Sequence, residues 1–501
     1  MKRSFYVLLA AVLLFGAVPL VSSAENGACG CGKDPVLFID GMNACPLIRD
    51  KGTPDERKAF NIDADGIISL VKDNRDAIWD LLDCRYSEET RRTVVDAVCS
   101  LFEDTQMTPD GESLYDITPD WRPRTDDIHR SGQNYKICFD WRLDPFENVK
   151  ILADYIDSIR SITGHDKVDI IAHSLGATLL NTYLSVYGTE KVGGCVWFCG
   201  AHNGIILETE LMRGRIHINA QDVTAYLHES TPDSFEYQLL SALMQGLADI
   251  GVTGSVLSIT NRLMDCLRED GSMREILLRS FGRMPSIWAC VDDTAYEAAK
   301  DYLFPTDDAR NENAGLIERI DRYHSEVLMR SAEIMKTAER ETGKVAVLSY
   351  YGLHVTPVTK DSGETGDQVL DAAHSSCGAT FAPFGGRLPK GDRVSPDRTA
   401  DASTALFPDR TWFVKGCPHS TTPAHIRELF ARVFASEGGF TVDDDAQFPQ
   451  FMSYDKETGS VSPLGKNGLK PAKFAARLRE LVLSMKYLIR SLFTKEFWDR
   501  A

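Results

Sequence analysis

The stretch DIIAHSLGATLL (residues 169–180) places Ser174 between an apolar run and a segment with helical spacing. KVDIIA predicts a strand, and GATLLNTYLSVY predicts a helix. A serine nucleophile at such a junction needs a sharp turn, which small residues two positions before and after it permit. Ala172 and Gly176 occupy those positions, although the usual pattern has glycine at both. The stretch therefore predicts a nucleophile elbow; the alternative is a serine that only caps a helix.

Strands and helices alternate on both sides of this junction. Runs that predict strands end at Asp40 and Asp140 before it, and VGGCVWFCGA, KVAVLSYYG and TWFVKG follow it. NVKILADYIDSIRSIT has apolar residues at helical spacing. This alternation predicts an α/β-hydrolase fold, with a mostly parallel central sheet and helices on both faces. Residues 204–342 interrupt it with mainly helical segments, which predict a helical cap inserted over the sheet.

The first 24 residues have the pattern of a secretory signal peptide. Lys2 and Arg3 precede an apolar run, and the small residues Ser22 and Ala24 stand at cleavage spacing. We expect cleavage after Ala24 and a secreted or extracytoplasmic protein; an uncleaved membrane anchor is the alternative, which the short apolar run disfavours. The predicted organisation is signal peptide 1–24, first core part 25–203, cap 204–342, second core part 343–437 and a C-terminal extension 438–501.

Composition and charge narrow the function classes. The chain has 501 residues, 43% of them hydrophobic, and a net charge of -18. An acidic chain of this kind is a poor partner for nucleic acid, whose recognition requires basic patches. Of its 12 cysteines, Cys29 and Cys31 form a Cys-Gly-Cys motif that suggests a metal. No second cysteine pair follows, so we expect neither a metal nor a cofactor, whereas export permits disulfides.

A catalytic serine needs a histidine base and an acid that orients it, and in this architecture they follow in the order serine, acid, histidine. Asp367 lies in a loop after the strand KVAVLSYYG, and His419 lies in a loop after TWFVKG. Both follow the carboxyl ends of strands, where active sites of open α/β sheets lie. The predicted triad is therefore Ser174, Asp367 and His419.

Several neighbours compete with these assignments. They are interpreted as surface or packing residues: Asp361, Asp371, His173, His374 and His425. Arg142 in FDWRLDP is interpreted as an ion-pair and packing residue, because acyl transfer gives it no role apart from binding a substrate head group.

The oxyanion hole should combine two backbone N–H groups. Leu175 follows the nucleophile and supplies one of them. The loop after the first central strand, DGMNA, should supply the other from Met42, because the preceding Gly41 lets the loop approach the substrate carbonyl. The alternative for Gly41 is an ordinary turn.

The chain resembles the lecithin:cholesterol acyltransferase-like branch of the α/β-hydrolases, in a bacterial lipase form. The matching pieces run in family order: PVLFIDGMN, FDWRLDP, AHSLG, MPSIWACV, YGLHVTPV, GDQVLDAAHSS and GCPHSTTP. The family's acid loop usually reads Gly-Asp-Gly-Thr-Val-Pro, and here only Gly366 and Asp367 match it. The resemblance implies the Ser174–His419–Asp367 triad, a lid made from insertions and ester-bearing lipid substrates.

Three functions are consistent with these observations. The first is a secreted serine hydrolase of lipid carboxylic esters, the second an O-acyltransferase that passes the acyl group to an alcohol, and the third a non-catalytic lipid-binding protein. Residues 466–500 carry nine Lys or Arg against three acidic residues and have apolar residues at helical spacing. Such a basic amphipathic helix can contact a membrane surface. Packing against the acidic body is favoured, because most amphipathic helices face a core.

Overall fold

The computed structural model describes residues 31–82, 87–217, 226, 229, 256–357 and 365–465. The predicted signal peptide, Cys29, Asp361 and the basic segment 466–500 lie outside these residues. Within them, no helix is both long enough and apolar enough to span a bilayer.

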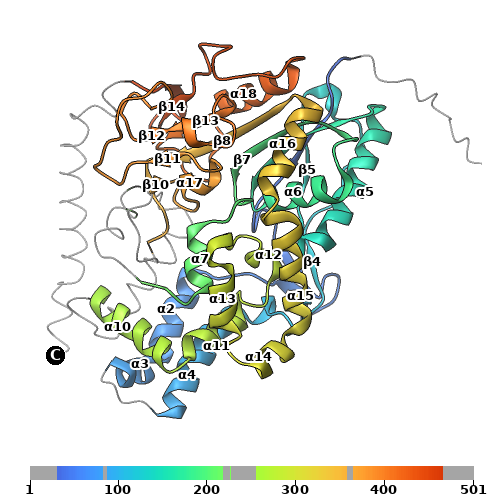
Figure 1. Ribbon diagram of the computed structural model, residues 1–501. Coiled ribbons are helices and arrows are strands. Elements are labelled where there is room, and N and C mark those ends of the chain that lie inside the picture. The colour runs from blue at the N-terminus through green and yellow to red at the C-terminus, as the bar shows by residue number, and fades with distance from the viewer. Residues whose placement is uncertain are drawn as a thin grey trace, which may run out of the picture.

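An eight-stranded sheet forms the centre of the molecule (Figure 1), in the order β15-β14-β13-β8-β7-β6-β1-β5. Neighbouring strands run parallel except for β15, which pairs antiparallel to β14. Its strands are β1 (Val36–Ile39), β5 (Tyr135–Ile137), β6 (Val168–Ser174), β7 (Val192–Gly200), β8 (Val345–Tyr351), β13 (Thr411–Lys415), β14 (Phe451–Asp455) and β15 (Ser460–Pro463). Strands β6 and β7 are buried along their whole length, because both faces of the sheet are covered.

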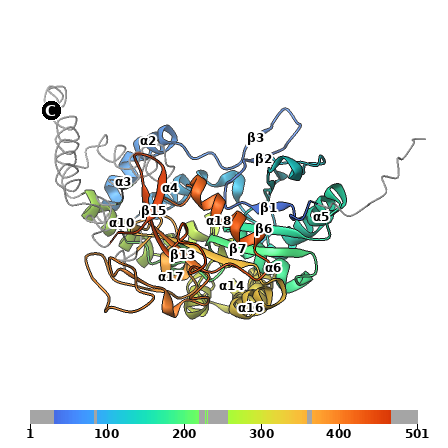
Figure 2. The same cartoon turned by 90° about the horizontal axis from the view of Figure 1, so that it is seen from above.

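Helices cover the two faces and bury two hydrophobic clusters (Figures 1 and 2). On one face lie α5 (Pro145–Thr163), α6 (Gly176–Tyr187) and α16 (Ser331–Thr342). On the other lies α18 (Ala424–Ala435). Alternate residues of one strand enter different clusters, as Ile170 and Ile171 of β6 do, which is the period-2 pattern of a strand. Sheet order, parallel pairing and these layers define an α/β-hydrolase fold.

The interrupting stretch is mainly helical among its described residues. It holds α7 (Ile206–Met212), α10 (Val256–Glu269), α11 (Ser272–Ser280), α12 (Pro285–Trp288), η3 (Asp293–Ala295), α13 (Tyr296–Leu303), α14 (Asp307–Glu312), α15 (Ala314–Tyr323), the π-helical turn η4 (His324–Leu328) and α16. Helix α16 packs on α6 and β7, so it covers the sheet although the predicted cap includes it. The cap is therefore better bounded before α16.

Helices from the first core part join this helical group. They are α2 (Ala64–Asp73), α3 (Arg75–Leu82) and α4 (Glu88–Ser100). Helix α3 contacts α10, and α4 contacts α11, as Figure 1 shows at the end of the molecule away from β13 and α18. Segments far apart in the chain thus build one helical layer.

The sheet extends beyond the predicted end of the second core part at residue 437. Strand β14 pairs with the edge of β13, and β15 closes a hairpin on β14. The turn contains Gly459 with φ +68°, a conformation that glycine adopts without steric cost. Residues 451–463 therefore belong to the core rather than to a separate extension.

Short elements complete the described chain. They are β2 (Leu47–Arg49), β3 (Arg57–Lys58), η1 (Glu103–Thr105), β4 (Ile117–Pro119), η2 (His129–Ser131), β9 (Leu353–His354), β10 (Thr365–Gly366), α17 (Ala372–Ser375), β11 (Thr380–Phe381), β12 (Ala400–Asp401) and η5 (Ala402–Thr404). The ten cysteines among the described residues are free thiols in this structure.

Candidate active site

Ser174 stands on a strained turn. Strand β6 ends at this residue and α6 begins at Gly176, as the elbow pattern predicts. The φ of Ser174 is +55°, a left-handed conformation that costs a non-glycine residue free energy. A Cβ atom at position 176 would lie 2.6 Å from the Ile39 carbonyl oxygen, so only glycine fits there. The local sequence thus permits the turn that presents the serine at the end of the sheet.

The loop after β1 lies against Ser174. A Cβ atom at position 41 would lie 2.7 Å from Ser174 Cβ and 3.0 Å from its Oγ, so Gly41 permits this approach. Met42 follows in the loop, and Leu175 is the residue between Ser174 and α6. Of the two residues predicted to supply oxyanion donors, Leu175 follows Ser174 directly in the chain. Met42 follows Gly41, the glycine that lies against Ser174.

Asp367 and His419 form a buried pair. His419 Nδ1 lies 2.7 Å from Asp367 Oδ2, and the His419 backbone N–H donates to the Asp367 carbonyl at 2.9 Å. The other carboxylate oxygen of Asp367 accepts the backbone N–H groups of Val369 at 3.0 Å and Leu370 at 2.7 Å. Four hydrogen bonds thus hold the carboxylate and the imidazole in one orientation.

The acid loop has an unusual backbone at the residue after Asp367. Gln368 follows the candidate acid directly, and its φ is +87°. This conformation favours glycine, so the loop holds Gln368 in a strained state. Thr356 contributes by donating its hydroxyl to the Gln368 carbonyl at 2.9 Å.

His173 connects the serine to the His419–Asp367 pair. Its ring stacks on that of His419 with centroids 4.7 Å apart, and its Nε2 lies 3.2 Å from the His419 carbonyl oxygen. Its Nδ1 lies 3.7 Å from Asp40 Oδ1. Burial, and then the charge of His419, lower the pKa of His173 against the opposite effect of Asp40. His173 is therefore a packing residue, as predicted, but it packs on the candidate base rather than at the surface.

The competing histidines have other partners. His425 lies on α18 and contacts other residues than Asp367. Its ring stacks on Phe448, and its Nε2 lies 2.9 Å from the Gln447 carbonyl oxygen. His374 lies between two carboxylates, with Nδ1 2.7 Å from Asp371 Oδ1 and Nε2 3.1 Å from Asp292 Oδ2. Burial would lower the pKa of His374, but these carboxylates raise it to about 10.

Arg142 has the ion-pair and packing role that its sequence position predicts. Its side chain is fully buried and forms two hydrogen bonds to the Asp140 carboxylate, at 2.6 and 3.0 Å. It also donates to the Thr105 carbonyl and the Ser113 hydroxyl. The guanidinium of Arg142 therefore makes four hydrogen bonds to groups of the protein itself.

Glu208 is a group that sequence reasoning missed. It lies on α7, which begins soon after β7, where the Ala201 N–H donates to the Ser174 carbonyl at 3.0 Å. Its Oε2 is buried and has no hydrogen-bond partner among the described residues. Burial, together with Asp371, raises the pKa of Glu208 to about 8, while the charge of His419 opposes this rise. A glutamate on a short helix carries no sequence signal for such a position.

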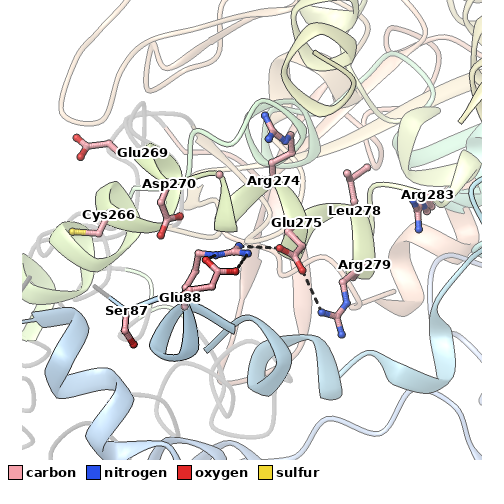
Figure 3. A pocket seen from close by; sticks show the side chains of 12 residues that line it. Ser87, Glu88, Cys266, Glu269, Asp270, Arg274, Glu275, Leu278, Arg279 and Arg283 are labelled. Atoms are coloured by element: carbon pink, nitrogen blue, oxygen red, sulfur yellow. Dashed lines mark hydrogen bonds and ion pairs between the residues drawn. The ribbon is translucent and has the colours of Figure 1, made fainter. Parts of the chain in front are cut away.

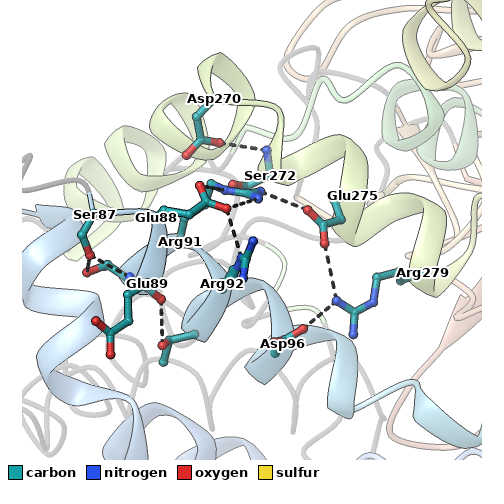
Figure 4. A network of polar contacts seen from close by, with 12 residues as sticks. Ser87, Glu88, Glu89, Arg91, Arg92, Asp96, Asp270, Ser272, Glu275 and Arg279 are labelled. Carbon is teal, nitrogen blue, oxygen red and sulfur yellow. Dashed lines mark hydrogen bonds and ion pairs between the residues drawn. The ribbon is translucent and has the colours of Figure 1, made fainter. Parts of the chain in front are cut away.

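A cavity lies elsewhere, between α4 and the α10–α11 segment (Figure 3). It has a volume of about 970 Å³, and its lining includes neither the predicted triad nor the predicted oxyanion residues. Figure 4 shows why its charges are largely neutralised: Glu275 pairs with Arg91 at 3.0 Å and with Arg279 at 3.6 Å, and Arg279 also pairs with Asp96. This network fastens α4 to α11.

Comparisons with known proteins add little to this geometry. No family model and no curated protein matches the chain. Among solved structures, the chain is similar to a candidate aryl esterase from Burkholderia cenocepacia, with 12% identity, coverage of 58% of this chain and 92% of that chain, and a TM-score of 0.16. The fold assignment therefore rests on the sheet order, the parallel pairing and the helical layers described above.

Proposed function

We propose that this protein is a serine hydrolase that cleaves carboxylic esters of lipids through an acyl-enzyme. The observation that carries the proposal is the 2.7 Å contact between Asp367 and His419, with the His419 ring stacked on the residue that precedes the strained Ser174. A nucleophile, a base and an acid that orients the base are the groups that this chemistry requires.

The mechanism follows from which nitrogen of His419 is engaged. Asp367 holds Nδ1, so Nε2 is the nitrogen that takes the proton from the Ser174 hydroxyl. Ser174 Oγ attacks the ester carbonyl, and the N–H groups of Met42 and Leu175 stabilise the oxyanion. Collapse expels the alcohol with the proton from His419, and water, activated by the same histidine, then releases the acid. An alcohol in place of water would make the reaction an acyl transfer.

Lipid esters are the proposed substrate class on two grounds. The sequence resembles lipases, and the interrupting helical stretch begins at residue 204, shortly after Ala201, whose N–H donates to the Ser174 carbonyl. Helices that start at this edge can supply an apolar environment from which water is excluded. We further propose that the protein is exported, on the pattern of its first 24 residues.

Labelling with a fluorophosphonate probe tests the proposal. We expect the probe to modify wild type at Ser174 and to leave Ser174→Ala unlabelled. Hydrolysis of p-nitrophenyl esters of increasing chain length should fall by about 10⁴ or more in Ser174→Ala and His419→Ala. His425→Ala is the matched control, because its ring contacts Phe448 and Gln447 instead. Full activity in folded Ser174→Ala would refute the triad and leave lipid binding as the alternative.

A further inference from the structure

Cys31, His129 and His165 converge at the opposite end of the sheet from Ser174. Cys31 precedes β1, His129 begins η2, and His165 lies in the loop between α5 and β6. Cys31 Sγ lies 3.4 Å from His129 Nε2 and 3.4 Å from His165 Nε2, and the two Nε2 atoms are 3.1 Å apart. Each of the three atoms thus contacts the other two.

These distances match the edges of a zinc coordination tetrahedron. With Zn–S of about 2.3 Å and Zn–N of about 2.0 Å, tetrahedral angles separate a sulfur from a nitrogen by about 3.5 Å and two nitrogens by about 3.3 Å. A hydrogen bond shared among all three atoms would be bifurcated and weaker, whereas one cation contacts all of them. The triangle is therefore better explained by a shared ion than by pairwise hydrogen bonds.

The donor set and its surroundings point to a borderline-soft ion. Thiolate and imidazole ligands suit Zn²⁺ and are poor ligands for Mg²⁺ or Ca²⁺. His165 Nδ1 lies 3.3 Å from Asp34 Oδ1. A carboxylate in this position fixes the tautomer so that Nε2 presents its lone pair to a metal, which is the usual outer partner of a zinc-binding histidine.

We propose that Cys31, His129 and His165 bind a structural Zn²⁺ ion. The ion ties the segment before β1 to η2 and to the loop that enters β6. Because β6 has 7 residues and a strand rises about 3.3 Å per residue, the site lies about 20 Å from Ser174 and takes no part in acyl transfer. Water completes the four-coordinate geometry.

The sequence analysis did not relate these three residues because the partners of Cys31 are distant in sequence. It relied on a second cysteine pair, whereas the other ligands are histidines 98 and 134 residues away from Cys31. Only the fold brings a loop before β5 and a loop before β6 to the chain entering β1.

Metal analysis of the full-length protein, purified without a polyhistidine tag, tests the proposal. We expect about one zinc per chain in wild type, and loss of the metal in Cys31→Ser, His129→Ala and His165→Ala. His425→Ala should keep the zinc. Asp34→Asn should weaken zinc binding about 10–100-fold in competition with a chromophoric chelator, because it removes only the outer partner.

Two readouts on wild type keep the test independent of variant folding. Co²⁺ substitution should give the visible bands of a tetrahedral site with a thiolate charge-transfer band, and chelation should lower the Tm while hydrolysis of a soluble ester well below the Tm is unchanged. Absence of zinc from wild type with no uptake on titration would overturn the proposal. So would zinc retained by all three ligand variants, or Cys31 found in a disulfide.

Discussion

Asp367 and Asp371 lie four residues apart but have different partners. Asp367 binds the candidate base His419, whereas Asp371 binds His374 and accepts the Ile206 N–H at 3.0 Å. We expect Asp367→Asn to lower kcat/KM for a soluble ester by about 10⁴, because the amide no longer selects the required imidazole tautomer. Asp371→Asn should keep most of the activity and lose stability instead. Equal losses of kcat/KM in the two folded variants would contradict this assignment.

Glu208 contributes a pH-dependent destabilisation. The pKa of Glu208 rises from 4.5 to about 8 in the folded state, so between these pH values the folded protein keeps a proton that the unfolded chain has released. The free energy of unfolding therefore falls as the pH rises from about 4.5 to 8. Glu208→Gln removes this dependence. Urea unfolding across this range should show the variant gaining stability relative to wild type as the pH increases. A constant difference would show that Glu208 titrates normally.

At the scale of elements, His374 connects the second core part to the helical insertion. It lies in α17, and its two carboxylate partners stand at the N-cap of α17 and before η3. The pair with Asp292 also lowers the pKa of that aspartate to about 2. This cluster therefore holds α17 and the segment after α12 together through charge.

The pH dependence of this cluster is predictable in sign. The raised pKa of His374 gives stability that is fully present below about pH 6.5 and is lost as the pH rises through about 10. The lowered pKa of Asp292 gives stability that is lost as the pH falls from about 3.8 to 2. The stability difference between wild type and His374→Gln, measured by chemical denaturation, should thus be largest between about pH 4 and 6.5. A difference that grows above pH 7 would contradict the ion-pair interpretation.

At the scale of the molecule, the described sheet is complete at β15, which ends at Pro463. The basic segment 466–500 follows it, and we expect that segment to pack on the acidic body of the protein. Truncation before Lys466 should then lower the Tm or the solubility, measured by thermal unfolding and light scattering. A truncated enzyme with an unchanged Tm and normal hydrolysis of soluble esters, but without binding to anionic vesicles, would establish the membrane interpretation.

Local patterns in the sequence determined the elbow, the main strands and the order of the candidate triad. A strand-to-helix junction needs small residues beside its serine, and Ala172 and Gly176 are neighbours of Ser174 in the chain. Asp367 and His419 were predictable because each follows its own strand, and parallel strands end at the same edge of a sheet. These inferences depend on local geometry, which the spacing of apolar residues along the sequence indicates.

Only the tertiary structure decided which distant residues meet. The stacking of His173 on His419, the buried carboxyl of Glu208, the packing of α16 on the sheet and the Cys31–His129–His165 cluster all join segments that no local pattern relates. Likewise, β14 became a core strand because the edge of β13 was available for pairing. The physical reason is that side-chain packing and edge pairing depend on how the elements are arranged in space. Local patterns in a single sequence do not specify which distant segments that arrangement brings together.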